Sequence, residues 1–212
     1  MDYQILIVYS VVSFFYIISP GPAIFLAITN GMTADMKIVA MSSLGNILGL
    51  FLLSAVSISG LGALLLASSA LFAVTKLVGA AYLIYLGVKQ LRNGKHGLTA
   101  DFDASAKKAR SSFSYFKEGF FLASTNPKPI LFFAALFPQF LNLKISVLPQ
   151  FFVMTVIFMF FSFISLCSYG YVSKSAGMFI NNRKNIVWFH RITGGIFITM
   201  GLGILRLKRI QQ

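Results

Sequence analysis

The sequence predicts an all-α integral membrane protein with six transmembrane helices, arranged as a 3+3 inverted repeat in which proline breaks the first and fourth helices. Three observations support this prediction. Of the 212 residues, 57% are hydrophobic and 11% are charged, and the mean hydropathy is +0.81. A span needs about 20 mostly apolar residues, so six spans fit this length as a single domain, 1–212. Two apolar stretches contain a proline pair, Pro20-Gly21-Pro22 and Pro127-Lys128-Pro129.

Six apolar stretches are long enough to be counted as spans. We expect them at 5–28, 38–60, 70–91, 119–141, 147–171 and 186–205. The second turn is the weakest boundary, because the stretch from residue 60 to residue 70 is itself apolar. A merged or re-entrant hairpin there gives five spans, which is the alternative topology.

The basic residues predict the orientation in the membrane. The chain has 18 Lys and Arg against 5 Asp and Glu, a net charge of +13. Six of the basic residues lie in the central connection, about 92–118, which we therefore place in the cytoplasm. Six spans then put both termini outside, although the C-terminal tail is also basic and five spans would remove that conflict. Basic loops at an anionic inner-membrane surface explain the charge without a nucleic-acid partner.

The two halves of the chain, about 1–95 and 112–212, resemble each other. The proline pairs are 107 positions apart, and Lys76-Leu-Val-Gly79-Ala80 matches Arg191-Ile-Thr-Gly194-Gly195 at an offset of 115. Three spans per half place the halves in opposite orientations, as in inverted-repeat transporters. A proline inside a helix frees a backbone carbonyl, which hydrocarbon cannot satisfy. Duplicated breaks therefore indicate a binding site in a transporter.

Lys128 is the residue most strongly predicted to be functional. It lies about 13 Å beyond the start of the fourth span, near the middle of a core about 30 Å thick. A cation there costs a few kcal/mol, so it normally faces a cavity or a partner. We interpret Lys128 as the counter-charge for a substrate carboxylate. The alternative is a lysine that snorkels to the interface beside a broken helix.

Polar residues beside the breaks complete the predicted substrate site. The Asn126 amide can cap the half-helix or bind a ligand. Asn46 lies in an apolar helix between two glycines and can line a cavity. Together with Lys128 and the break residues, these amides form the candidate site: Pro20, Gly21, Pro22, Asn46, Asn126, Pro127, Lys128, Pro129.

Glycines and acidic residues have other predicted roles. Glycines in apolar helices mark close packing or hinges, here Gly45, Gly49, Gly79, Gly194 and Gly195. The apolar interiors contain no carboxylate, so Asp35 and Glu118, at span ends, are the gate or coupling candidates. The single cysteine, Cys167, excludes an intramolecular disulfide. We expect no metal site and no cofactor.

The chain resembles the LysE/RhtB family of amino-acid exporters over essentially its whole length. The resemblance rests on Ser19-Pro20-Gly21-Pro22, the run from Lys76 to Arg92, the Gly45 to Gly49 pair and the run from Thr125 to Phe140. It implies a small inner-membrane exporter of amino acids or close derivatives that uses the proton gradient. The family's asparagine-proline-lysine element corresponds to residues 126–128. Some members carry an acid in the fifth span, where this chain has only polar residues such as Ser162, Ser165 and Ser168.

Three functions are consistent with a membrane protein of this kind, and the residues favour the first. Export of amino acids explains the lysine and both breaks. Export of divalent metal cations is the second hypothesis, but the spans offer few carboxylate, imidazole or thiolate ligands and a lysine repels cations. An intramembrane enzyme is the third, and it lacks a motif for a nucleophile or a catalytic metal. The sequence specifies no oligomeric state.

Overall fold

The computed structural model describes residues 3–67, 69–93, 111–142, 145–175 and 183–206, and every regular element in these ranges is a helix. The predicted all-α class is therefore confirmed. Most of the predicted basic loop, residues 94–110, lies outside the described residues. The elements are α1 Tyr3–Ile18, α2 Pro22–Thr33, α3 Met36–Ala67, α4 Ser69–Asn93, α5 Ser112–Thr125, α6 Pro127–Leu131, η1 Phe132–Leu136, η2 Phe137–Phe140, α7 Val147–Ser175 and α8 Arg183–Arg206.

Each proline pair separates two helices, as predicted. The axes of α1 and α2 differ by 55°, and those of α5 and the segment Pro127–Phe140 by 44°. Both α2 and α6 carry a proline in the first turn, where its missing N–H has no helical partner to lose. Each Pro-x-Pro sequence thus ends one helix and begins the next.

The second break is followed by irregular winding that the sequence did not predict. After the five residues of α6, the chain forms the π-helical segment η1 and then the 3-10 segment η2, which has Pro138 in its first turn. π-Helical turns are rare and often occur at functional sites.

Two helices are individually long and apolar enough to cross a membrane, α3 over Met36–Ser59 and α7 over Val147–Ser173. Counting each bent pair as one span raises the number to four. The apolar parts of α4 and α8 are shorter, Leu77–Lys89 and Gly194–Gly203. α3 also extends to Ala67, past the predicted end at residue 60, because the added residues are mostly strong helix formers without proline. α3 and α4 are nevertheless separate helices.

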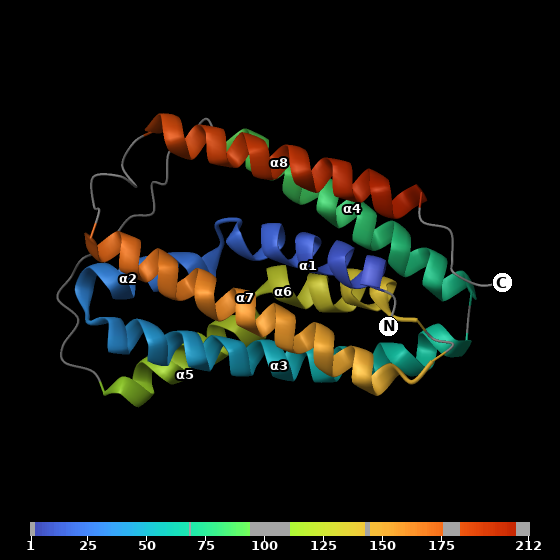
Figure 1. The fold of residues 1–212 in the computed structure, drawn as a ribbon, viewed down its shortest axis with the longest axis horizontal. Helices are drawn as coiled ribbons and strands as arrows, with labels where there is room; N and C mark the ends of the chain where they lie inside the picture. Colours follow the sequence, from blue (N-terminus) through green and yellow to red (C-terminus); the bar gives the residue numbers. More distant parts are fainter. Residues whose placement is uncertain (1–2, 68, 94–110, 143–144, 176–182, 207–212) are drawn as a thin grey trace.

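The helices run roughly along one long axis (Figure 1). α4 and α8 pack together on one side, and α3 packs against both α5 and α7 on the other. α1 and α6 lie between these groups (Figure 1). α2 packs mainly against α7. One half of each broken helix, α1 or α6, therefore lies in the middle of the molecule.

The largest part of the core consists of aromatic side chains around α1, η1 and α7. The Phe132 ring lies 4.6 Å from the Tyr16 ring and 4.7 Å from the Phe158 ring, measured between centroids. We call the following residues, all at most 3% exposed, the aromatic cluster: Tyr9, Tyr16, Phe132, Phe133, Phe137, Phe140, Phe151, Phe158 and Phe197.

Candidate functional site

The two breaks meet at Lys128. Its Nζ donates hydrogen bonds to the Ser19 carbonyl oxygen at 2.7 Å and to Ser19 Oγ at 2.6 Å, and it lies 4.8 Å from the centroid of the Tyr16 ring. A residue at the start of α6 thereby contacts the end of α1, from the other broken span. The partly buried ammonium group has only uncharged oxygens among these partners.

The first break leaves three carbonyls without their usual helical donors, and side chains replace those donors. Pro20 and Pro22 lack the N–H groups that would bond the carbonyls of Tyr16 and Ile18, four residues earlier. The Tyr16 carbonyl accepts from Ser19 Oγ at 2.8 Å, and the Ile18 carbonyl accepts from the Tyr169 hydroxyl at 2.9 Å. The third carbonyl, of Ser19, accepts from Lys128. The break is thus stabilised by residues from α6 and α7.

The second break is organised by Asn126. Its Oδ1 accepts from the backbone N–H of Lys128 at 3.0 Å and caps α6. The Lys128 carbonyl accepts from the Tyr16 hydroxyl as well as from the Phe132 N–H. Both the backbone and the side chain of Lys128 are therefore bonded to residues near the first break.

Gly21 makes room for the lysine side chain. A Cβ built on Gly21 would lie 3.3 Å from Lys128 Cδ and 3.6 Å from its Nζ. Pro20, Pro22 and Pro127 set the backbone at the breaks, and Pro129 lies buried within α6.

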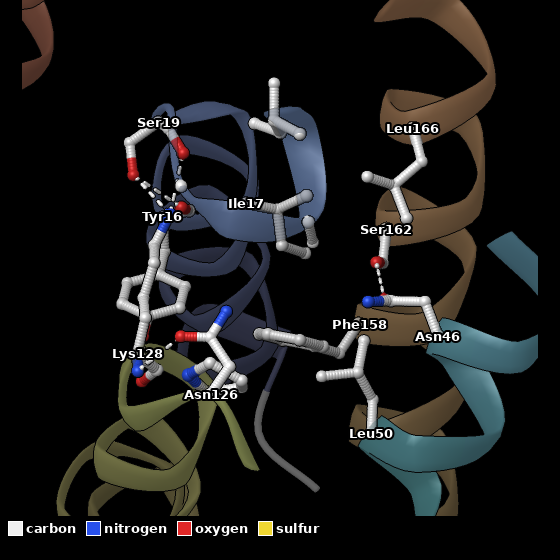
Figure 2. Close-up of a pocket in the computed structure, with 14 residues that line it drawn as sticks. Tyr16, Ile17, Ser19, Asn46, Leu50, Asn126, Lys128, Phe158, Ser162 and Leu166 are labelled. Carbon is white, nitrogen blue, oxygen red and sulfur yellow. Dashed lines mark hydrogen bonds between the residues drawn. The ribbon is translucent and has the colours of Figure 1, made fainter. Parts of the chain in front are cut away.

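A pocket opens beside Lys128, between the two broken helices and the helices α3 and α7 (Figure 2). Its volume of about 50 Å³ can hold a few water molecules. A bound amino acid would require the walls to move apart. Polar groups lie at both sides and apolar groups between them. The lining residues are Tyr16, Ile17, Ser19, Gly21, Ala23, Ile24, Asn46, Leu50, Asn126, Lys128, Pro129, Phe158, Ser162 and Leu166.

Asn46 lies across the pocket from Lys128 (Figure 2). Its Oδ1 accepts a hydrogen bond from Ser162 Oγ at 3.3 Å, which joins α3 to α7. Both side chains are buried. The structure therefore brings Lys128, Asn126 and Asn46, three residues selected from the sequence, to one pocket.

The gate candidates lie elsewhere. Asp35 is in the turn between α2 and α3, where its carbonyl accepts from the N–H groups of Ile38 and Val39. Glu118 lies in the first half of α5. Neither residue lines the pocket.

Two of the predicted packing glycines lie between α3 and α5. A Cβ built on Gly45 would lie 1.9 Å from the carbonyl oxygen of Phe116, and one on Gly49 would lie 2.7 Å from that of Phe120. These distances are far below normal contact, so α3 and α5 approach closely only because glycine has no side chain.

The glycines of α4 and α8 differ from one another. A Cβ on Gly79 would lie 2.9 Å from the Ala135 carbonyl oxygen, and one on Gly194 would lie 2.8 Å from that of Gly87. Gly195 does not have the predicted packing role, because nothing lies within 4 Å of a Cβ built there. Successive residues of an α-helix point in different directions, so Gly195 faces away from the side of α8 on which Gly194 contacts α4.

Sequence reasoning missed several residues that shape the site. Tyr16 and Tyr169 bond the break through their hydroxyls, and Ser162 supports Asn46. Ser19, which directly precedes the first break, binds the lysine through its hydroxyl and its carbonyl. The sequence did offer a signal for Tyr16, because its hydroxyl lies one helical turn before Pro20 and could be expected near the break. The partner of Asn46 had no local signal, because 116 positions separate it from Ser162.

The described residues contain no group of three or more His, Cys, Asp or Glu side chains arranged to hold a metal ion. Cys167 lies 4.0 Å from Ser43 Oγ, between α7 and α3. The polar groups of the pocket are instead an ammonium group, two amides, two serine hydroxyls and backbone carbonyls. This set can bind a small molecule that carries both a carboxylate and hydrogen-bond donors.

Comparison with known proteins identifies the family. Residues 14–208 match the family model of the LysE type translocators. A homoserine/homoserine lactone efflux protein of Salmonella typhi is 30% identical over 184 residues, 87% of each chain. A leucine efflux protein of Klebsiella pneumoniae is 32% identical over 136 residues, 64% of this chain and 63% of the relative. An uncharacterized membrane protein of Vibrio cholerae is 29% identical over 97% of each chain. No solved structure matches. The chain, with its two proline-broken helices joined through a lysine, belongs to the LysE type translocator family.

Proposed function

We propose that this protein is a secondary transporter that exports amino acids or close derivatives across the inner membrane. The observation that carries the proposal is the pocket at Lys128, where the two broken helices meet. Among the described residues, the Lys128 ammonium group donates to Ser19 oxygens alone, and it can exchange one of them for a carboxylate, which forms a stronger charge-assisted bond.

The substrate binds by separating Lys128 from Ser19. Its carboxylate accepts from Lys128 Nζ, and its ammonium group donates to the Ser19 carbonyl that the lysine leaves. The amides of Asn46 and Asn126 lie within the same pocket and offer further bonds to the substrate. Each buried polar group then keeps a partner during the exchange, which limits its free-energy cost.

The N-terminus of α2 adds to carboxylate binding. Gly21 caps this 12-residue helix without a side-chain hydrogen bond, and Gly21, Ala23 and Ile24 all line the pocket. A helix N-terminus carries partial positive charge and binds anions. At the N-terminus of α6, Asn126 Oδ1 already accepts from the Lys128 N–H, so this N–H is not offered to the substrate.

The membrane arrangement in this proposal is six spans in a 3+3 inverted repeat, with the basic central loop in the cytoplasm. The contacts between α4 and α8 support it. Gly201 lies against the Ala80 carbonyl, and Gly194 lies against that of Gly87. At the offset of 115 between the halves, residue 80 corresponds to residue 195 and residue 87 to residue 202. The contact between residues 80 and 201 therefore has a counterpart, shifted by one residue at each end, in the contact between residues 87 and 194. A two-fold relation between the halves explains this pairing.

The names of the relatives define the first substrates to test. Proteins similar to this chain are named efflux proteins for homoserine, homoserine lactone and leucine. The middle of the pocket is apolar, with Ile17, Leu50 and Phe158 among its lining. Such a lining suits an uncharged side chain better than a cationic one.

The test is efflux of labelled amino acids from proteoliposomes that contain the purified protein. We expect export of leucine or homoserine by the native chain and a loss of at least about tenfold in Lys128→Ala, since a hydrogen bond to a charged group contributes about 1.5–3 kcal/mol. Lys89→Ala is the matched control, because Lys89 is an exposed lysine on α4 over the Tyr85 ring. Unchanged efflux in Lys128→Ala would contradict the binding site.

Proton coupling is tested in the same vesicles. The family resemblance implies it, and Asp35 and Glu118 are the candidate acids. We expect efflux to increase when a pH gradient is imposed and to decrease when an ionophore removes it.

Divalent cations are assayed in parallel, and transport of a metal without transport of any amino acid would replace the proposal with metal export.

A further inference from the structure

The contact between α2 and α7 differs from the rest of the core. A Cβ built on Gly31 of α2 would lie 2.1 Å from the Gly170 carbonyl oxygen of α7 and 2.4 Å from Ser173 Oγ. Ser173 Oγ also donates to the Ile28 carbonyl at 3.1 Å. We call this contact the α2–α7 seam. It is sealed by small residues and backbone atoms, with a small separate apolar group formed by Ile24, Ala27, Ile28 and Leu166.

The side chain of Asn30 is buried at this end of α2 and is 0% exposed. Among the residues that the structure describes, neither its amide nitrogen nor its amide oxygen has a hydrogen-bond partner. A buried amide in this state is destabilising, and in a membrane protein the group commonly faces a pathway. The burial of Asn30 therefore points to another state in which water or a ligand reaches it.

The hinge for such a state lies at the first break. α2 is joined to α1 through Ser19-Pro20-Gly21, where the helix axis turns by 55°. Lys128 holds this joint closed, because its Nζ binds Ser19 while its side chain lies against Gly21. The bond to Lys128 is thus the contact that a bound substrate would replace.

We propose that the α2–α7 seam is the access route to the Lys128 pocket, that it opens when Lys128 releases Ser19, and that Asn30 binds the amino acid in transit. The substrate class rests on the proposed function. A carboxylate that takes Lys128 from Ser19 favours the state in which the hinge is free, so binding shifts the population toward an open seam. Asn30 can then pair with either charged end of the substrate.

Leu166 connects the pocket to the seam. It lines the pocket and also packs against Ile24, Ala27 and Ile28 of α2. Along α7, the residues that line the pocket are followed within two turns by Gly170 and Ser173. A displacement of α2 away from α7 would extend the pocket toward Asn30.

Thiol labelling tests the seam. Cys167 is the only cysteine, so Cys167→Ser removes all thiols, and Asn30→Cys then introduces one. The purified protein in detergent is treated with a bulky maleimide, and the mass increase of the intact chain is followed with time. We expect slow labelling of the free protein and labelling at least about tenfold faster when Lys128→Ala is added, because the charge-assisted bonds to Ser19 are lost.

Ser54→Cys is the matched control. Ser54 is also 0% exposed, but it lies on α3 between Leu50 and Ile58, which both pack in the core that contains the aromatic cluster. Its labelling should stay slow in both backgrounds. Equal acceleration at Ser54 would mean general loosening and would overturn the proposal. Unchanged slow labelling of Asn30→Cys in the Lys128→Ala background would also overturn it.

Leucine and homoserine serve as ligands in the native Lys128 background. Either one should accelerate labelling of Asn30→Cys if it is a substrate. The Lys128→Ala comparison needs no ligand, so it judges the seam even if neither amino acid is transported. If the Cys167→Ser chain exports amino acids but Lys128→Ala does not accelerate labelling of Asn30→Cys, the proposed function stands and this inference is rejected.

Cross-linking gives a second measurement. Ile28→Cys and Ser173→Cys, introduced together into the Cys167→Ser chain, place thiols on both sides of the seam. A short, reducible bis-thiol reagent should stop efflux, and reduction should restore it. The two single-cysteine chains should be insensitive to the reagent. Full efflux in the cross-linked protein would overturn the route.

Discussion

The two sides of the Lys128 pocket are sealed in different ways. On one side the aromatic cluster fills the space between α1, η1 and α7 with rings that touch one another at centroid distances such as 4.6 and 4.7 Å. On the other side the α2–α7 seam is closed by glycine, serine and backbone atoms around Gly31 and Gly170. One side is closed by large rings, and the other by small residues and a four-residue apolar group, next to the buried amide of Asn30, which has no partner among the described residues.

This difference identifies which side opens at lower free energy. Aromatic pairs contribute about 0.5–1.5 kcal/mol each beyond the burial of their area. Opening the aromatic cluster would break several such pairs and expose large rings. Opening the α2–α7 seam separates a smaller apolar group that contains none of the buried rings of the aromatic cluster, and it lets new partners reach the amide of Asn30. The seam is therefore the side expected to open first.

The largest expected effect is on stability, from Phe132→Ala in the aromatic cluster. Removal of a fully buried ring typically destabilises by about 3–5 kcal/mol. We expect a clear decrease in the temperature at which the purified protein loses its monodisperse elution. Phe121→Ala is the control, because Phe121 is 60% exposed on α5. Equal decreases for the two variants would contradict the assigned importance of the cluster.

The next effect is expected from Gly31→Val in the α2–α7 seam. The added side chain would meet the Gly170 carbonyl and force α2 from α7, at about 1–3 kcal/mol. We expect efflux to fall at least about tenfold and Asn30→Cys to be labelled without substrate. Gly195→Val, where nothing lies within 4 Å of the added Cβ, should behave like the native chain. Retained efflux in Gly31→Val would argue against a closely packed seam.

A smaller effect is expected at the start of α6, between the two sides. Asn126→Ala removes the cap on the Lys128 N–H, worth about 1 kcal/mol. We expect efflux to decrease several-fold, because the lysine is held less well. Ser111→Ala removes a similar cap at Ser114, 3.3 Å away at the start of α5, and should leave efflux unchanged. Similar losses in both variants would indicate a general effect of helix stability.

The smallest effect is expected from Ser162→Ala on the far wall of the pocket. The bond to Asn46 is neutral and 3.3 Å long, and such bonds contribute about 0.5–1.5 kcal/mol. The apparent KM for efflux should rise a few-fold, with little change in maximal rate. Ser59→Ala removes only a bond to the Ala55 carbonyl on an exposed face. A KM unchanged by Ser162→Ala would remove Asn46 and Ser162 from substrate binding.

Local chemistry explains why the sequence predicted the breaks so well. A proline in an apolar helix has the same consequence in almost every surrounding, so both breaks were found at the predicted residues. The glycines at the α3 and α5 contact were predicted for a similar reason. The packing role predicted for Gly195 was wrong, because the side of a helix on which a glycine lies depends on how the whole helix packs.

Contacts between distant segments were beyond sequence reasoning. Lys128 and Ser19 are 109 positions apart, and Tyr169 and Ile18 are 151 apart. No pattern in one segment identifies a hydrogen-bond donor supplied by another helix. The π-helical winding of η1 was missed as well. Its Phe132 ring packs against Tyr16 and Phe158 of other helices, and such contacts have no signal in the local sequence.

For the transporter that we propose, the lysine without an acidic partner in the pocket predicts a dependence of transport on membrane voltage. Among the described residues that line the pocket, Lys128 is the one with a formal charge. In the export that we propose, a zwitterionic substrate adds no net charge, so a protonated Lys128 gives the loaded and the empty pocket the same positive charge. If the side from which water reaches Lys128 changes during transport, that charge crosses part of the membrane field, which is worth about 2.3 kcal/mol per 100 mV for a full crossing. The resting potential of the cell would then bias the face to which the empty pocket opens.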